Sequence, residues 1–187
     1  GVGVVGAEEK IQRGEHAGSG RELGPREGGV LNEERVDDQE GGEDCDGAGA
    51  AVLMDADLAA KRGLPILGLF RGMQLASVAP EEMSIAITPA IRKLMKQHGL
   101  NTGDVDLWEL HEAYAVTTLY NQAQLETPWE TTNVNGGAIA LGHPYGMSGI
   151  RYLGSTLMEL GRRGMNKAVV GVCTAGGMAT AAYLERV

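Results

Sequence analysis

The stretch Asn133–Pro144 reads NVNGGAIALGHP and places one histidine, His143, in a turn built of small residues. Thirty residues later, Val172–Gly177 (VCTAGG) forms a second glycine-rich turn after an apolar run, and it contains Cys173. Glycines let backbone N–H groups approach a ligand closely and stabilise an oxyanion. A histidine and a cysteine on such turns therefore indicate acid/base or thiol chemistry rather than core packing.

Short apolar runs alternate with amphipathic segments on both sides of these turns. We expect strands at 48–54, 66–71, 105–110, 168–173 and 180–184, and helices at 55–62, 88–98, 112–125 and 150–163. This alternation predicts an α/β layered fold with a mixed, mostly parallel sheet and covering helices. The last two strands are joined by the short glycine turn and are expected to be antiparallel.

Composition narrows the classes of function. The formal net charge of −9 argues against binding to nucleic acid or to an anionic membrane. No apolar run reaches the roughly 18 residues of a membrane helix. The two cysteines, Cys45 and Cys173, are far apart and do not suggest a disulfide framework. We therefore expect a reducing, cytoplasm-like compartment, and an organelle matrix also fits. No spacing of Cys, His and Asp predicts a metal site.

Residues 1–44 differ from the rest of the chain. They hold eleven Gly, twelve acidic and five basic residues, and no aromatic residue. Such a segment buries too little apolar surface to offset the entropy of ordering it. We expect a disordered leader. The alternative is a segment foreign to the rest of the protein, such as a reading-frame error or a fusion scar would produce.

A third motif, His111–Tyr114 (HEAY), completes a pattern with Gly142–Pro144 (GHP) and the turn that follows Cys173. In this order the three motifs resemble the C-terminal part of the thiolases, which carry Asn-Glu-Ala-Phe or His-Glu-Ala-Phe, Gly-His-Pro and a late Cys followed by glycines. The resemblance runs from about residue 45 to residue 187. Ala175 and Ala179 stand where many members have Gly. The resemblance implies a thiolase-like layered fold, with residues 45–64 as the tail of the N-terminal domain and 65–187 as the C-terminal domain.

The resemblance also implies roles for three residues. His143 would take the proton from a nucleophilic cysteine and help to bind the thioester oxygen. Cys173 would deprotonate the α-carbon of acetyl-CoA and later reprotonate the product. His111 would orient a water or the thioester oxygen. Substrate binding is expected at five further residues: Met83, Ala113, Tyr114, Gly176 and Gly177.

Each of these residues also has a plainer interpretation when it is taken alone. His143 could be a loop histidine bonded to a backbone carbonyl, and Cys173 a small buried hydrophobe. His111 could cap the helix that follows it, and Tyr114 and Met83 could belong to the core. If the chemical interpretation holds, His143 and Cys173 should approach each other across one pocket.

The implied reaction interconverts acyl-CoA plus acetyl-CoA with 3-ketoacyl-CoA plus coenzyme A. Coenzyme A thioesters are substrates, and no separate cofactor is implied. No cysteine precedes Cys45, so the nucleophile is missing from these residues and the chain alone is expected to be inactive. The expected partner is a second copy or a nucleophile-bearing half. The alternatives are a catalytically silent subunit that binds acyl-CoA and a truncated product without function.

Overall fold

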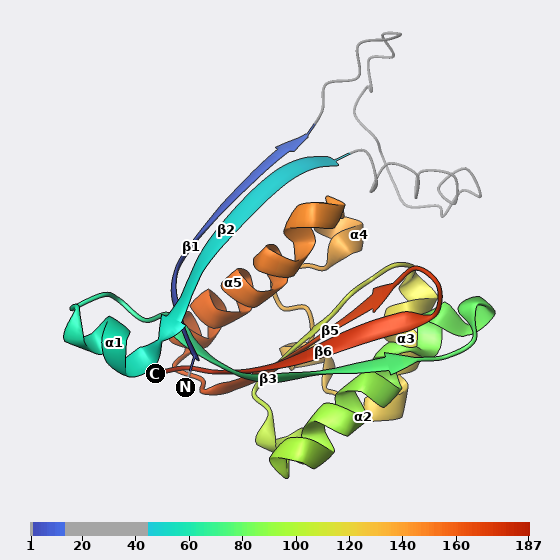
Figure 1. The fold of residues 1–187 in the computed structure, drawn as a ribbon. Coiled ribbons are helices and arrows are strands. Elements are labelled where there is room, and N and C mark those ends of the chain that lie inside the picture. The colour runs from blue at the N-terminus through green and yellow to red at the C-terminus, as the bar shows by residue number, and fades with distance from the viewer. Residues whose placement is uncertain (1, 14–44) are drawn as a thin grey trace, which may run out of the picture.

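The computed structural model describes residues 2–13 and 45–187, and its strands form one sheet with the order β2-β1-β3-β6-β5-β4 (Figure 1). The strands are β1 (Val2–Arg13), β2 (Cys45–Asp55), β3 (Gly68–Ser77), β4 (Leu107–Leu110), β5 (Lys167–Thr174) and β6 (Met178–Glu185). The α-helices are α1 (Ala56–Lys61), α2 (Ile87–His98), α3 (Ala115–Leu125), α4 (Ala138–Leu141) and α5 (Tyr145–Arg163). Three short 3-10 helices complete the order: η3 (Pro80–Ile85), η4 (Thr102–Asp104) and η5 (Trp129–Thr131).

The direction of the strands corrects the expectation of a mostly parallel sheet. In the described part of the chain, β1–β2, β1–β3, β3–β6 and β5–β6 are antiparallel, and only β4–β5 is parallel. Parallel neighbours need a long crossover connection, and the chain between Leu110 and Lys167 supplies one for β4 and β5. The closing pair β5–β6 is antiparallel, as expected from its short turn.

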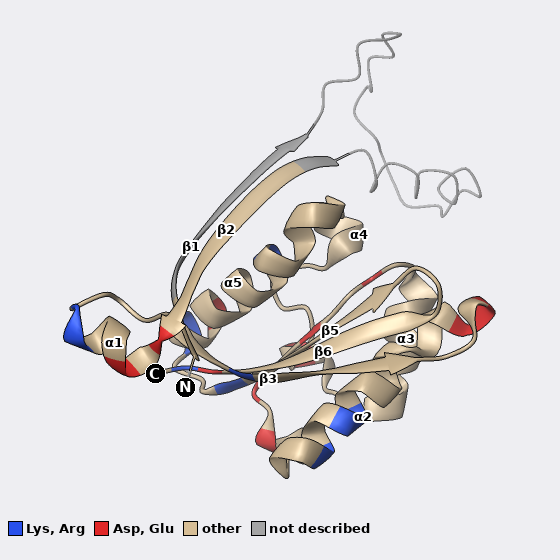
Figure 2. Cartoon of the chain, in the orientation of Figure 1, with Lys and Arg blue, Asp and Glu red and all other residues tan. Residues whose placement is uncertain are grey.

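Helix α2 covers one face of the sheet because its apolar residues recur at helical spacing. Ile87, Ile91 and Leu94 are fully buried against residues of β5 and β6 such as Val169 and Ala181. The exposed side of α2 carries its basic residues, which are blue in Figure 2. Gly99 ends the helix in the left-handed conformation, as the sequence predicted.

Helix α5 packs on the opposite face and lies between the sheet and the long bent pair β1–β2 (Figure 1). Its stripe of Tyr152, Leu157 and Leu160 is buried against residues of β4, β5 and β6, including Leu107 and Leu184. This helix ends at Gly164, again as predicted.

The N-terminal segment differs in part from its expectation. Val2–Arg13 forms strand β1 and pairs with β2 along its length, where we expected a disordered leader. Residues 14–44 lie outside the described residues. The proposed domain boundary near residue 64 stays a prediction.

Several elements begin or end elsewhere than predicted, and α5 begins at Tyr145 rather than at residue 150. Strand β3 extends to Ser77 because it pairs with the whole of β6, which the apolar pattern did not indicate. Helix α3 begins at Ala115, three residues later than expected, so His111–Tyr114 form an irregular connection. No helix in the described residues is both long and apolar enough to cross a membrane.

Candidate active site

His111 follows the last residue of β4 and is held by the sheet itself. Its backbone N–H donates to the carbonyl of Gly171 on β5 over 2.8 Å, which extends the parallel ladder by one residue. Its side chain is 3% exposed, and Nδ1 lies 2.6 Å from the Tyr152 hydroxyl on α5. His111 is therefore a fixed group at the strand end rather than a helix cap.

His143 lies in the turn between α4 and α5. Gly142 before it has a φ of +88°, a conformation that favours glycine, and Pro144 after it is the N-cap of α5. His143 Nδ1 lies 2.8 Å from the Ser148 hydroxyl. Arg151 Nη1 donates to the Gly142 carbonyl over 2.8 Å. The turn is therefore bonded to α5 both at Gly142 and at His143.

The two histidines meet although 32 positions of the sequence separate them. Their ring centroids are 4.2 Å apart. Burial lowers the pKa of His111, with smaller contributions from the nearby His143 and Arg151, to about 3. His111 is therefore neutral at working pH and can act as a donor or acceptor, whereas a role as a cation is excluded.

Three buried groups beside this pair were missed by the sequence interpretation. Glu109, Arg151 and Tyr152 are 8%, 2% and 1% exposed. Burial raises the pKa of Glu109 to about 8 against the opposing charge of Arg151. Burial also raises the pKa of Tyr152 to about 12. The sequence did offer a signal for two of them, since Glu109 stands inside an apolar strand and Arg151 next to the apolar stripe of a helix. Charged residues at such positions are rarely buried without a role.

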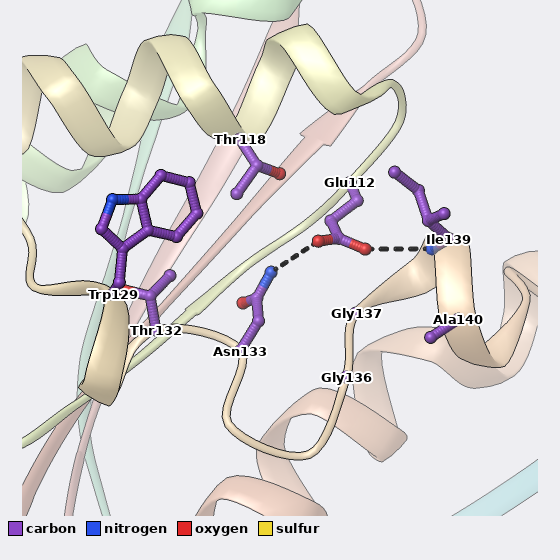
Figure 3. Close-up of a pocket in the computed structure, with 9 residues that line it drawn as sticks. All are labelled: Glu112, Thr118, Trp129, Thr132, Asn133, Gly136, Gly137, Ile139 and Ala140. Atoms are coloured by element: carbon purple, nitrogen blue, oxygen red, sulfur yellow. Dashed lines mark hydrogen bonds between the residues drawn. The ribbon is translucent and has the colours of Figure 1, made fainter. Parts of the chain in front are cut away.

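Glu112 fastens the glycine-rich loop to the end of β4. Its carboxylate accepts from Asn133 Nδ2 over 3.2 Å and from the backbone N–H of Ile139 over 3.0 Å (Figure 3). Asn133 in turn pairs with both the N–H and the carbonyl of Leu110 over 2.8 and 2.9 Å. A side chain at Gly137 would collide with the Glu112 carboxylate, which explains the glycine there.

A cavity of about 350 Å³ opens on this bracing network, and Trp129 and Thr118 also line it (Figure 3). Neither His143 nor Cys173 lines this cavity. It is therefore not the pocket that the sequence predicted between those two residues.

Cys173 lies on β5, two residues after the Gly171 that bonds His111. It is 6% exposed and belongs to the core cluster on the α2 face, together with Ala113 and Met83 at the edge of that cluster. Burial raises the pKa of its thiol, so the thiol is protonated at neutral pH. The close approach of Cys173 to His143 stays a prediction.

The turn after Cys173 has the conformation that its glycines allow. Gly176 and Gly177 have φ of +85° and +80°, and Gly177 accepts a bond from Val78 N–H over 2.8 Å. A Cβ on Gly177 would meet the Val78 carbonyl, whereas the space beside Gly176 is open. Tyr114 is 49% exposed at the start of α3. The roles of these residues, and of Met83 and Ala113, in substrate binding stay predictions.

Within the described residues, no group of three His, Cys, Asp or Glu side chains could hold a metal ion. The groups available for chemistry are a neutral His111 in contact with His143, a buried thiol, and glycine turns whose backbone can stabilise an oxyanion.

Comparison with known proteins identifies the family of this chain. The family "Thiolase, C-terminal domain" matches residues 64–186. The 3-ketoacyl-CoA thiolase 5, peroxisomal, of Arabidopsis thaliana is 46% identical over 143 residues, which is 75% of this chain and 31% of the relative. The acetyl-CoA acetyltransferase of Paracoccus denitrificans is 41% identical over 141 residues, 75% of this chain and 36% of the relative.

Solved structures show the same likeness. The human mitochondrial 3-ketoacyl-CoA thiolase matches with a TM-score of 0.74 and 38% identity, over 76% of this chain and 36% of that one. The same human enzyme has also been solved in complex with CoA, and it matches with a TM-score of 0.73. The chain thus spans about a third of the length of the relatives it matches. With its matching sequence and fold, the chain belongs to the thiolase family, of which it contains the C-terminal domain.

Proposed function

We propose that this chain supplies the histidine and thiol half of a thiolase-type acyl-CoA C-acyltransferase. The observation that carries the proposal is the contact between His111 and His143, whose ring centroids are 4.2 Å apart beside the end of the strand that bears Cys173. The identity to 3-ketoacyl-CoA thiolases and acetyl-CoA acetyltransferases supports the same reaction class.

In the proposed reaction, a nucleophilic cysteine from another polypeptide segment attacks the acyl thioester while His143 takes the thiol proton. The acyl group moves to that cysteine, and the departing coenzyme A thiolate takes a proton. In the second stage Cys173 first loses its thiol proton to the solvent, and the resulting thiolate removes a proton from the α-carbon of acetyl-CoA. The carbanion attacks the acyl group, which forms the 3-ketoacyl-CoA and frees the nucleophilic cysteine. His111 and the turn at Gly176 would bear the developing oxyanions.

Coenzyme A thioesters are the proposed substrates, and the likeness to a thiolase solved in complex with CoA supports this. The proposed partner is a nucleophile-bearing thiolase half or a second copy of this chain. A reducing compartment fits a chain whose Cys173 works as a free thiol. The cytoplasm and an organelle matrix both provide one, and relatives carry peroxisomal and mitochondrial names.

The test is thiolysis of acetoacetyl-CoA by the purified chain, alone and mixed with the N-terminal half of the Arabidopsis relative. We expect no sustained turnover alone, and turnover after mixing. Cys173→Ala should abolish the restored turnover, whereas Cys45→Ala, which changes the other cysteine, should retain it. Turnover by the chain alone would contradict the proposed division of roles. Binding of acyl-CoA without restored turnover would favour the silent-subunit alternative.

A further inference from the structure

One face of α5 presents a hydroxyl to each of the two histidines. Ser148 and Tyr152 are four residues apart, so they lie one above the other on the same side of the helix. The Ser148 hydroxyl contacts Nδ1 of His143 over 2.8 Å, and the Tyr152 hydroxyl contacts Nδ1 of His111 over 2.6 Å. A neutral imidazole carries one proton, and the group at Nδ1 decides which nitrogen holds it.

Ser148 acts as an acceptor toward His143. Its hydroxyl has one proton, which it donates to the backbone carbonyl of Pro144 over 2.9 Å. The contact with His143 must then use a lone pair of the Ser148 oxygen and a proton on Nδ1. His143 Nε2 is thereby left without a proton in the neutral ring.

Tyr152 acts as a donor toward His111. The separation of 2.6 Å is shorter than the roughly 2.7 to 3.2 Å typical of an N–H donor, and it is within the range of an O–H donor. The cationic guanidinium of Arg151 lies 4.9 Å from the centre of the Tyr152 ring, and because a guanidinium has no acceptor atom it cannot take the phenol proton. The phenol proton then points at Nδ1, and the proton of His111 resides on Nε2.

We infer that α5 holds the two histidines in opposite tautomers, His143 with its proton on Nδ1 and His111 with its proton on Nε2. Ser148 and Tyr152 are positioning residues that set these tautomers. The pKa of His111 is low, about 3, and that of Tyr152 is high, about 12. Both His111 and Tyr152 therefore stay neutral across the working pH range.

Opposite tautomers give the two histidines different tasks in the reaction proposed above, on which this consequence rests. His143 Nε2 can accept the proton of a thiol, and the resulting imidazolium keeps its Nδ1–H bond to Ser148. The same proton can return to the departing coenzyme A thiolate. His111 transfers no proton, because its Nε2–H serves as a neutral donor to the thioester oxygen, a position where removal of one such donor typically costs about a hundredfold or more in rate.

The test is ¹⁵N NMR of the chain labelled with [¹⁵N]histidine, since protonated and unprotonated ring nitrogens resonate at well-separated shifts. Histidine signals are assigned from single His→Asn variants. We expect an Nε2–H tautomer for His111 and an Nδ1–H tautomer for His143. Tyr152→Phe should shift the Nδ1 and Nε2 signals of His111 toward a mixture of tautomers and leave the tautomer of His143 unchanged. Ser148→Ala should shift the signals of His143 toward a mixture of tautomers and leave those of His111 unchanged. Tyr120→Phe, at an exposed tyrosine of α3, should change neither histidine.

The same tautomer on both rings, or a Tyr152→Phe spectrum with unchanged His111 nitrogens, would overturn the inference. If either variant fails to fold, as judged by its backbone amide spectrum, the tautomers of the unaltered chain decide the question by themselves. The measurement needs neither substrate nor partner. Opposite tautomers without restored turnover would therefore uphold this inference about the site while the proposed function fails.

Discussion

Glu109 should make the stability of this protein fall with rising pH. Its pKa is about 8 in the folded chain against an ordinary value of 4.5, chiefly because the side chain is buried. Arg151 opposes this shift and Glu112 adds to it. Between these two pKa values the unfolded chain releases the Glu109 proton while the folded chain keeps it. Because the folded state then binds more protons, the free energy of unfolding decreases as pH rises.

The size of this effect follows from the two pKa values. Each pH unit between them lowers the free energy of unfolding by about 1.36 kcal/mol. From pH 5 to pH 7 the contribution of Glu109 is therefore a loss of about 2 to 3 kcal/mol. Glu109→Gln keeps the shape of the protonated side chain and removes its titration. The variant should lose less stability than the unaltered protein over this interval, by that amount.

Urea unfolding followed by circular dichroism at pH 5, 6, 7 and 8 measures this difference. The comparison is between the two pH slopes, so any constant offset caused by the amide drops out. Glu81→Gln, a change at an exposed carboxylate, is the matched control and should keep the slope of the unaltered protein. Equal slopes for Glu109→Gln and the unaltered protein would refute the reasoning that Glu109 is protonated when folded.

Three further predictions concern the loop, the helix and the thiol. Gly137→Ala should destabilise the fold by about 1 to 3 kcal/mol in urea unfolding, because its Cβ meets the Glu112 carboxylate; Gly103→Ala, which has open space, should be near neutral. Gly149→Ala also meets open space and lies inside α5, so it should raise stability by roughly 0.5 to 1 kcal/mol, and a loss would contradict this packing. Burial raises the pKa of Cys173, so more of its thiolate should form between pH 7 and pH 9. The chain mixed with the N-terminal half should therefore exchange deuterium into the methyl group of acetyl-CoA faster at pH 9 than at pH 7. A flat pH profile, measured by mass spectrometry, would count against Cys173 as the base.

Local signals in the sequence predicted local structure well. Gly99 and Gly164 end their helices in the left-handed conformation because no Cβ opposes it there, and the short turn at Gly176 forces an antiparallel closing pair. Strand direction elsewhere depends on which strands become neighbours, and β3 pairs with β6 from the far end of the chain. No local pattern carries that information.

The same limit applies to the candidate site. His143 and Cys173 could be found because glycine-rich turns mark them, and His111 because of the HEAY motif; the structure brings the two histidines together. Tyr152 could not be found in this way, because it stands in a helix stripe whose spacing is that of an ordinary core, and Arg151 offered only the weaker signal of a charge next to that stripe. Their contacts with His111 and Gly142 exist only after α5 has packed on the sheet.

The single parallel pair of the described sheet explains why the site lies where it does. Parallel strands end at the same edge, so His111 after β4 and Cys173 near the end of β5 reach one edge by construction. The crossover between these strands contains the glycine loop, His143 and α5, and α5 must return across the sheet to connect them. An antiparallel β4–β5 pair would separate His111 and Cys173 by the length of a strand. The residues that position the histidines are therefore on α5, because that helix is part of the crossover. The antiparallel strands of the rest of the sheet contribute to the face on which α5 packs.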